Sequence, residues 1–117
     1  MGSTEWSDDE VTRWQRLMDG ETVCVSMRRG VHPNLIWHAT HRGLFVRIDR
    51  QSQWGNPFVL GRDGDRGTVI RRYEVEHLPN RPALLAAVSE LRGKALGCWC
   101  APEPCHGDVL AVAAFAH

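Results

Sequence analysis

The sequence predicts a small α/β fold, in which a single layer of short strands is flanked by helices. Its 117 residues are enough for one domain, and contents of 43% hydrophobic and 24% charged residues are typical of globular domains. Short apolar runs of strand length alternate with segments whose apolar residues recur at helical spacing. This alternation indicates a layered α/β architecture.

The first predicted element is a helix that begins after Ser7 and ends before Gly20. Ser7 and Glu10 have the spacing of a capping box, and a glycine commonly ends a helix. We therefore treat residues 1–20 as an N-terminal helical extension. Residues 21–117 then form a single α/β domain.

The domain opens with a strand over residues 22–27, because Val23 and Val25 favour extended backbone. The following stretch, residues 28–41, contains Gly30 and Pro33, so we expect irregular structure with a short strand over 35–38.

The remaining elements follow from apolar spacing and from turn residues. We expect a strand over 43–49, a helix over 68–78, a helix capped by Asn80 over 80–92, a strand over 94–100, and a final helix capped by Asp108 over 109–116. The strand over 94–100 is a short apolar run bounded by Gly93 and Pro102, which predicts a position inside the sheet.

The overall charge is balanced, but arginine is concentrated in the middle of the chain. The formal net charge is +0 at pH 7, which argues against a protein that coats DNA. The arginine-rich region 28–72 could nevertheless contact nucleic acid locally. The acidic N-terminus lacks the apolar run of a secretory signal, and no apolar stretch is long enough for a membrane helix. We expect a cytoplasmic protein without a membrane partner.

The most informative segment runs from Cys98 to Asp108. Cys98 and Cys100 share one face of the predicted strand, and a turn with two prolines brings back Cys105 and His106. These four side chains could form a zinc site, or the three thiolates could hold an iron–sulfur cluster.

Metal-free readings of the same segment remain open. A Cys–His pair at a helix start could form an activated nucleophile, with Cys100 or Cys105 attacking and Asp108 as a catalytic base. The cysteines could also pack as small hydrophobic residues, with Asp108 only capping the helix.

A second informative segment is the loop that contains Asn56, Pro57 and Phe58. Pro57 restricts the backbone, so the Asn56 amide is held where it could read a base edge, while Trp54 or Phe58 stacks on a planar ligand. The alternative is a rigid turn whose aromatic residues anchor it in the core.

Two arginines close to this loop are candidate ligand-binding residues. Arg50 precedes the loop, and Arg62 lies in a glycine-rich segment before the helix over 68–78. Arginine forms bidentate contacts with phosphate, although a solvated turn would have the same sequence.

With both motifs in view, the chain resembles a family of small uncharacterised domains from bacteria and phages. The marks of the family are an NPF motif, here residues 56–58, and a CWC motif, here residues 98–100, and the resemblance covers about residues 43–112. It implies no reaction, although occurrence in phages points to nucleotide or nucleic-acid metabolism.

Two classes of function follow from these motifs. The first is a small enzyme acting on a nucleotide, nucleobase or nucleic-acid-related substrate, with a pocket between the NPF loop and the Cys/His site. The second is a zinc-stabilised module that binds nucleic acid or protein without catalysis. Convergence of Asn56 and Cys100 on one concave pocket favours the enzyme.

Overall fold

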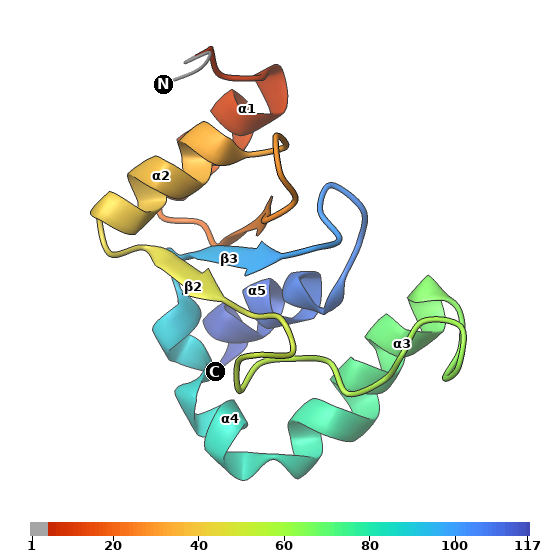
Figure 1. Cartoon of the computed structure of the whole chain (residues 1–117). Coiled ribbons are helices and arrows are strands. Elements are labelled where there is room, and N and C mark those ends of the chain that lie inside the picture. Colours follow the sequence, from red (N-terminus) through yellow and green to blue (C-terminus); the bar gives the residue numbers. More distant parts are fainter. Residues whose placement is uncertain (1–4) are drawn as a thin grey trace.

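A computed structural model describes residues 5–117 and confirms the α/β fold class (Figure 1). In this part of the chain the sheet consists of three parallel strands, namely β1 (Val23–Ser26), β2 (Phe45–Arg47) and β3 (Ala95–Cys98). Strand β3 lies in the centre, with Leu96 paired to Cys24 on one side and Val46 on the other. The predicted interior position of this strand is confirmed, although it ends at Cys98 and not at Cys100.

Helices lie on both faces of the sheet (Figure 1). The α-helices are α1 (Asp8–Met18), α2 (Pro33–His41), α3 (Arg66–Arg72), α4 (Pro82–Ala87) and α5 (His106–Ala116). A π-helical turn, η1 (Tyr73–His77), continues α3, and 3₁₀ turns η2 (Leu78–Asn80) and η3 (Val88–Leu91) flank α4. The predicted helices over 68–78 and 80–92 are therefore present, each with a change of helix type.

Successive side chains of each strand point to opposite faces of the sheet, and each face has its own hydrophobic core. Val23, Val25 and Ala95 pack with Leu17 of α1 and Leu35 of α2 on one face. The alternate positions of the same strands face the other way, into a larger core with α4, η3 and α5. This arrangement follows from the two-residue period of a strand, and it buries the sheet on both sides.

The prediction of irregular structure with a short strand over residues 28–41 is wrong, because residues 33–41 form helix α2. Pro33 occupies the first turn, where its missing N–H costs nothing. Leu35 and Ala39, four residues apart, are both fully buried. The apolar run that resembled a strand therefore belongs to one helical face.

Two predicted helix caps are also wrong. Arg81 occupies the N-cap of α4 in place of Asn80, and it makes no capping hydrogen bond through its side chain. Helix α5 begins at His106 after an N-cap at Cys105. Asp108 lies three residues inside this cap, where its carboxylate accepts a hydrogen bond from the Cys105 backbone at 3.1 Å.

The capping box predicted for the first helix is confirmed. The Ser7 hydroxyl accepts from Glu10 N at 3.0 Å, and the Glu10 carboxylate accepts from Ser7 N at 3.1 Å. Among residues 5–117, no helix is both long enough and apolar enough to cross a membrane.

Candidate functional site

A cavity of about 500 Å³ lies at the carboxyl ends of the three parallel strands. Each strand delivers a lining residue two positions after its last residue, namely Arg28 after β1, Asp49 after β2 and Cys100 after β3. The full lining consists of Arg28, Asp49, Arg50, Gln51, Asn56, Phe58, Leu60, Arg66, Val69, Ile70, Cys98, Trp99, Cys100, Pro104, Cys105 and His106. Ligands of open α/β sheets bind at this edge.

The NPF loop is held together by the Asn56 side chain. Its amide nitrogen donates to the Val69 carbonyl at 3.0 Å, and its amide oxygen accepts from Phe58 N at 3.0 Å. Trp54 is only 4% exposed and lies in the larger core. The backbone carbonyl of Trp54 accepts a hydrogen bond from Tyr73 Oη at 2.8 Å. Phe58 is therefore the aromatic side chain that this loop presents to the cavity.

Trp99 supplies a second aromatic wall, and Asp49 fixes its orientation. The indole N–H donates to Asp49 Oδ2 at 3.0 Å, and this carboxylate also accepts from Arg47 at 2.7 Å. The hydrogen bond from Arg47 lowers the pKa of Asp49, so the carboxylate is charged at pH 7. Trp99 is 47% exposed, so its ring combines a fixed position with a free surface.

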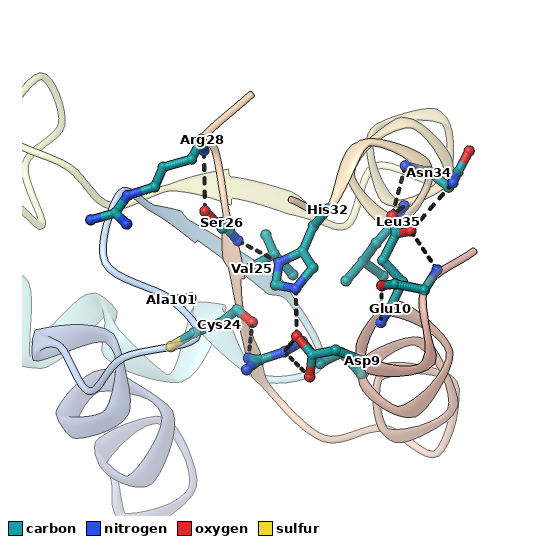
Figure 2. A network of polar contacts seen from close by, with 12 residues as sticks. Asp9, Glu10, Cys24, Val25, Ser26, Arg28, His32, Asn34, Leu35 and Ala101 are labelled. Atoms are coloured by element: carbon teal, nitrogen blue, oxygen red, sulfur yellow. Dashed lines mark hydrogen bonds and ion pairs between the residues drawn. The ribbon is translucent and has the colours of Figure 1, made fainter. Parts of the chain in front are cut away.

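Arg28 reaches the cavity from the turn after β1, and a buried polar network positions that turn (Figure 2). His32 Nδ1 accepts from Ser26 N at 2.7 Å, so the proton must lie on Nε2, which donates to Asp9 at 2.6 Å. The Ser26 hydroxyl accepts from Arg28 N at 3.1 Å. In the described part of the chain no acidic side chain pairs with the Arg28 guanidinium, which is therefore available to a ligand.

The cysteines converge at the N-terminus of α5. Cys105 Sγ lies 3.5 Å from Cys98 Sγ, and the Cys24 thiol donates to Asp108 Oδ1 at 3.7 Å. Gly107 allows this crowding, because an added Cβ would lie 2.6 Å from Cys24 Sγ. All four cysteines have free thiols.

Two thiols of this cluster have lowered pKa values, about 7 for Cys98 and about 6 for Cys100. A hydrogen bond from Cys105, together with one from Arg66, outweighs burial and lowers the pKa of Cys100 to about 6. The contacts with the other three thiols raise the pKa of Cys105. Negative charge at pH 7 is therefore favoured on Cys100 and next on Cys98, whereas Cys105 keeps its proton.

His106 is turned toward the protein backbone. Its Nε2 lies 2.8 Å from the Ile48 carbonyl, which can only accept, so Nε2 carries the proton. Burial lowers the pKa of this ring, which is neutral at pH 7. Among residues 5–117, no group of three or more His, Cys, Asp or Glu side chains is arranged to hold a metal ion. Zinc on Cys98, Cys100, Cys105 and His106, and the iron–sulfur alternative, have no support from this arrangement and stay predictions.

The structure brings most of the predicted site residues to one cavity. Those that line it are Arg50, Asn56, Phe58, Cys98, Cys100, Cys105 and His106. Trp54 is in the core, Arg62 pairs with Asp63 on the surface, and Asp108 caps α5. These three residues are outside the lining.

Arg28 and Trp99 were not singled out from the sequence as cavity residues, nor was Cys24 as a member of the thiol cluster. A signal existed only for Trp99, which separates the two cysteines of the CWC motif. Arg66 belongs to the glycine-rich segment at the start of α3 that could bind an anion, and it lines the cavity. The placement of Arg28 and Cys24 depends on how strands and loops meet in space.

Most of the residues that line the cavity lie in a segment that matches one known sequence family. A sequence family described as Domain of unknown function (DUF4326) matches residues 37–116, which is more than half of the chain. The chain belongs to this family. The DUF4326 match begins inside α2 and includes both motif loops, but not α1, β1 or Arg28.

The chain is also similar to a phage protein, described as "Uncharacterized 12.4 kDa protein in nrdA-td intergenic region" of Enterobacteria phage T4. The two are 37% identical over 70 residues, which is 56% of this chain and 63% of the phage protein, so the chain spans less than two thirds of that relative's length. No solved structure matches the chain. The expected resemblance to an uncharacterised family found in phages is confirmed at this level.

Proposed function

We propose that this protein is a small enzyme acting on a nucleotide, nucleobase or nucleic-acid-related substrate. The observation that carries this proposal is the shared cavity, because Asn56 and Cys100 both line it although they are distant in sequence. A concave site with fixed polar groups at the carboxyl edge of parallel strands is the usual form of a small-molecule site.

The lining of the cavity favours an anionic ligand with a planar group. Arg28, Arg50 and Arg66 provide positive charge, and guanidinium groups form paired hydrogen bonds with phosphate. Trp99 and Phe58 provide two aromatic faces on which a base can stack. A nucleotide combines these two chemical features in one molecule.

Cys100 is the residue we assign to nucleophilic attack. It is half-buried and lines the cavity together with Arg66 and Cys105, which lower the pKa of its thiol to about 6. Cys105, which keeps its proton, is placed to return a proton to the Cys100 sulfur or to a leaving group.

The NPF and CWC motifs are, in this proposal, the parts of the family sequence that build the site. One motif holds the loop over the cavity, and the other supplies Trp99 and two of the thiols. We place the activity in the cytoplasm, where thiols remain reduced.

Isothermal titration with nucleoside monophosphates and triphosphates tests ligand binding. Arg28→Ala should weaken binding about tenfold or more, because a charge-assisted hydrogen bond contributes about 1.5–3 kcal/mol. Arg71→Ala is the matched control, since Arg71 is exposed on α3 and lies outside the cavity lining. Equal affinities of the wild type and Arg28→Ala would contradict this reading of the cavity.

A second measurement separates the enzyme from the binding module. The nucleotides are incubated with wild type and with Cys100→Ser, and new products are sought by chromatography and mass spectrometry. Turnover by the wild type alone supports the enzyme. Absence of turnover, combined with strongly salt-dependent binding of oligonucleotides, supports the arginine-rich module instead.

A further inference from the structure

The cysteine cluster has a property that nucleotide binding does not require, namely that three thiols line one cavity and two of their sulfur atoms are in contact. The Cys105 sulfur is 3.5 Å from that of Cys98, and Cys98, Cys100 and Cys105 all line the cavity. A disulfide bond has a sulfur–sulfur distance of about 2.05 Å, so neighbouring thiols need only a short movement to form one. The fold therefore keeps the Cys105 thiol beside one cysteine and on the same cavity wall as another.

Access to the cluster is unequal. Cys98 is 2% exposed and Cys105 is 3% exposed, whereas Cys100 is half-buried at the cavity wall. A small molecule that enters the cavity therefore meets the Cys100 sulfur first. Arg66, which lines the same cavity, can stabilise negative charge there and on an oxygen that leaves.

We propose that the cluster is a redox-active site, in which a hydroperoxide oxidises Cys100 and Cys105 then forms a disulfide with it. This second activity does not depend on the nucleotide substrate proposed above. It requires only an accessible cysteine and a second thiol close to it, and Cys100 and Cys105 both line the cavity.

The first step is attack of the Cys100 thiolate on one oxygen of the hydroperoxide. A sulfur–oxygen bond forms, the oxygen–oxygen bond breaks, and the departing oxygen takes a proton and leaves as water or an alcohol. Cys100 is oxidised by two electrons to a sulfenic acid, and the hydroperoxide is reduced by the same two electrons.

The second step joins the two sulfur atoms. Cys105 sulfur attacks Cys100 sulfur, the sulfur–oxygen bond breaks, and the hydroxyl group leaves as water with the proton of the Cys105 thiol. A dithiol reductant returns both residues to thiols by disulfide exchange. The disulfide would remove the thiolate from the cavity wall for as long as it lasts.

The experiment treats the fully reduced wild-type chain with one equivalent of hydrogen peroxide, followed by alkylation under denaturing conditions and peptide mass spectrometry. We expect a disulfide linking Cys100 and Cys105, with a mass lower by two hydrogen atoms, and its reversal by dithiothreitol. In Cys105→Ser the sulfenic acid should persist on Cys100 and react with dimedone. In Cys100→Ser oxidation of the remaining thiols should be slower, on the order of tenfold.

Cys24→Ser is the matched control, because the Cys24 thiol donates to Asp108 and lies outside the cavity lining. It should form the same disulfide at the wild-type rate. If Cys105→Ser does not fold, as judged by near-ultraviolet circular dichroism, Cys105→Ala replaces it. Four alkylatable thiols after peroxide would overturn the proposal, as would equal oxidation rates in wild type and Cys100→Ser.

Two further outcomes keep this proposal separate from the others. Zinc that remains bound to the purified chain and protects its thiols from peroxide would overturn the redox reading in favour of a metal site. Nucleotide titration of the reduced wild type, repeated in parallel, reports on the ligand proposal alone, so each proposal can fail independently.

Discussion

Asn56 uses both ends of its side-chain amide within the protein. The amide bridges the NPF loop to α3 through the Val69 carbonyl and closes the loop through Phe58 N. A ligand that hydrogen-bonds to the Asn56 amide would have to replace one of these two contacts. At this residue, positioning of the loop and recognition of a ligand are therefore competing uses of the same atoms.

Asn56→Ala should consequently lower the free energy of unfolding by about 1–3 kcal/mol, because it leaves a half-buried carbonyl and N–H without their partners. Urea denaturation measures this loss. Arg62→Ala serves as the control, because Arg62 pairs only at the surface, and its effect should stay within about 0.5 kcal/mol. Unchanged stability of Asn56→Ala would instead indicate that the Asn56 amide contacts a ligand directly.

Gly97 of β3 lies where side chains of neighbouring segments pack closely against the strand. A Cβ on Gly97 would lie 2.5 Å from the Phe45 ring and 3.1 Å from Met27 Sδ. Gly97→Ala should therefore destabilise the protein by about 1–3 kcal/mol through overpacking. Thermal denaturation provides the measurement.

Gly67→Ala is the matched control for the same substitution. Gly67 is exposed in α3, where the nearest atom to an added Cβ is 3.8 Å away. Alanine favours a helix by up to about 1 kcal/mol over glycine, so this variant should be neutral or more stable. Equal effects at both positions would show that crowding at Gly97 is relieved by movement of Phe45.

Elements with strong local signals were predictable from the sequence, and those set by distant contacts were not. The capping box of α1 and the bounded apolar run of β3 are local, and both are confirmed. Helix α2 was missed because its apolar residues are also typical of a strand, and only packing against α1 and the sheet decides between them.

The same distinction applies to the site. Convergence of the CWC segment with Cys105 follows from a short turn, so the sequence could indicate it. Cys24 joins the cluster only because β1 pairs with β3 in a register that places it opposite Leu96. Arg28 reaches the cavity for the same reason, since the parallel pairing brings the ends of β1 and β3 together.

Over the whole molecule, α1 is connected to α2 by buried polar contacts as well as by apolar packing (Figure 2). Glu10 is only 2% exposed, and its carboxylate accepts from Asn34 N at 2.8 Å and from Leu35 N at 3.0 Å. It thereby satisfies two N–H groups in the first turn of α2. The Glu10 carboxylate therefore caps the N-terminus of α1 and also binds the first turn of α2.

This connection predicts how the stability of the protein depends on pH. Burial alone would raise the pKa of Glu10, but the hydrogen bonds from Leu35, Ser7 and Asn34 outweigh it and hold the pKa below its ordinary value of 4.5. A lowered pKa in the folded state means that the stabilisation is complete above about pH 4.5 and is lost as the pH falls through the folded value. The charged form is the one that the folded protein favours.

Glu10→Gln should remove this dependence. At pH 7 the variant should be less stable than the wild type by about 1.5–3 kcal/mol, because an amide NH₂ would face backbone N–H groups that now meet a carboxylate oxygen. Below pH 4.5 the wild type protonates and the difference between the two curves should shrink. Glu21→Gln, which alters only an exposed pair with Arg16, should follow the wild-type curve. A gap between wild type and Glu10→Gln that stays constant from pH 7 to pH 3 would show that the Glu10 charge does not hold α1 against α2.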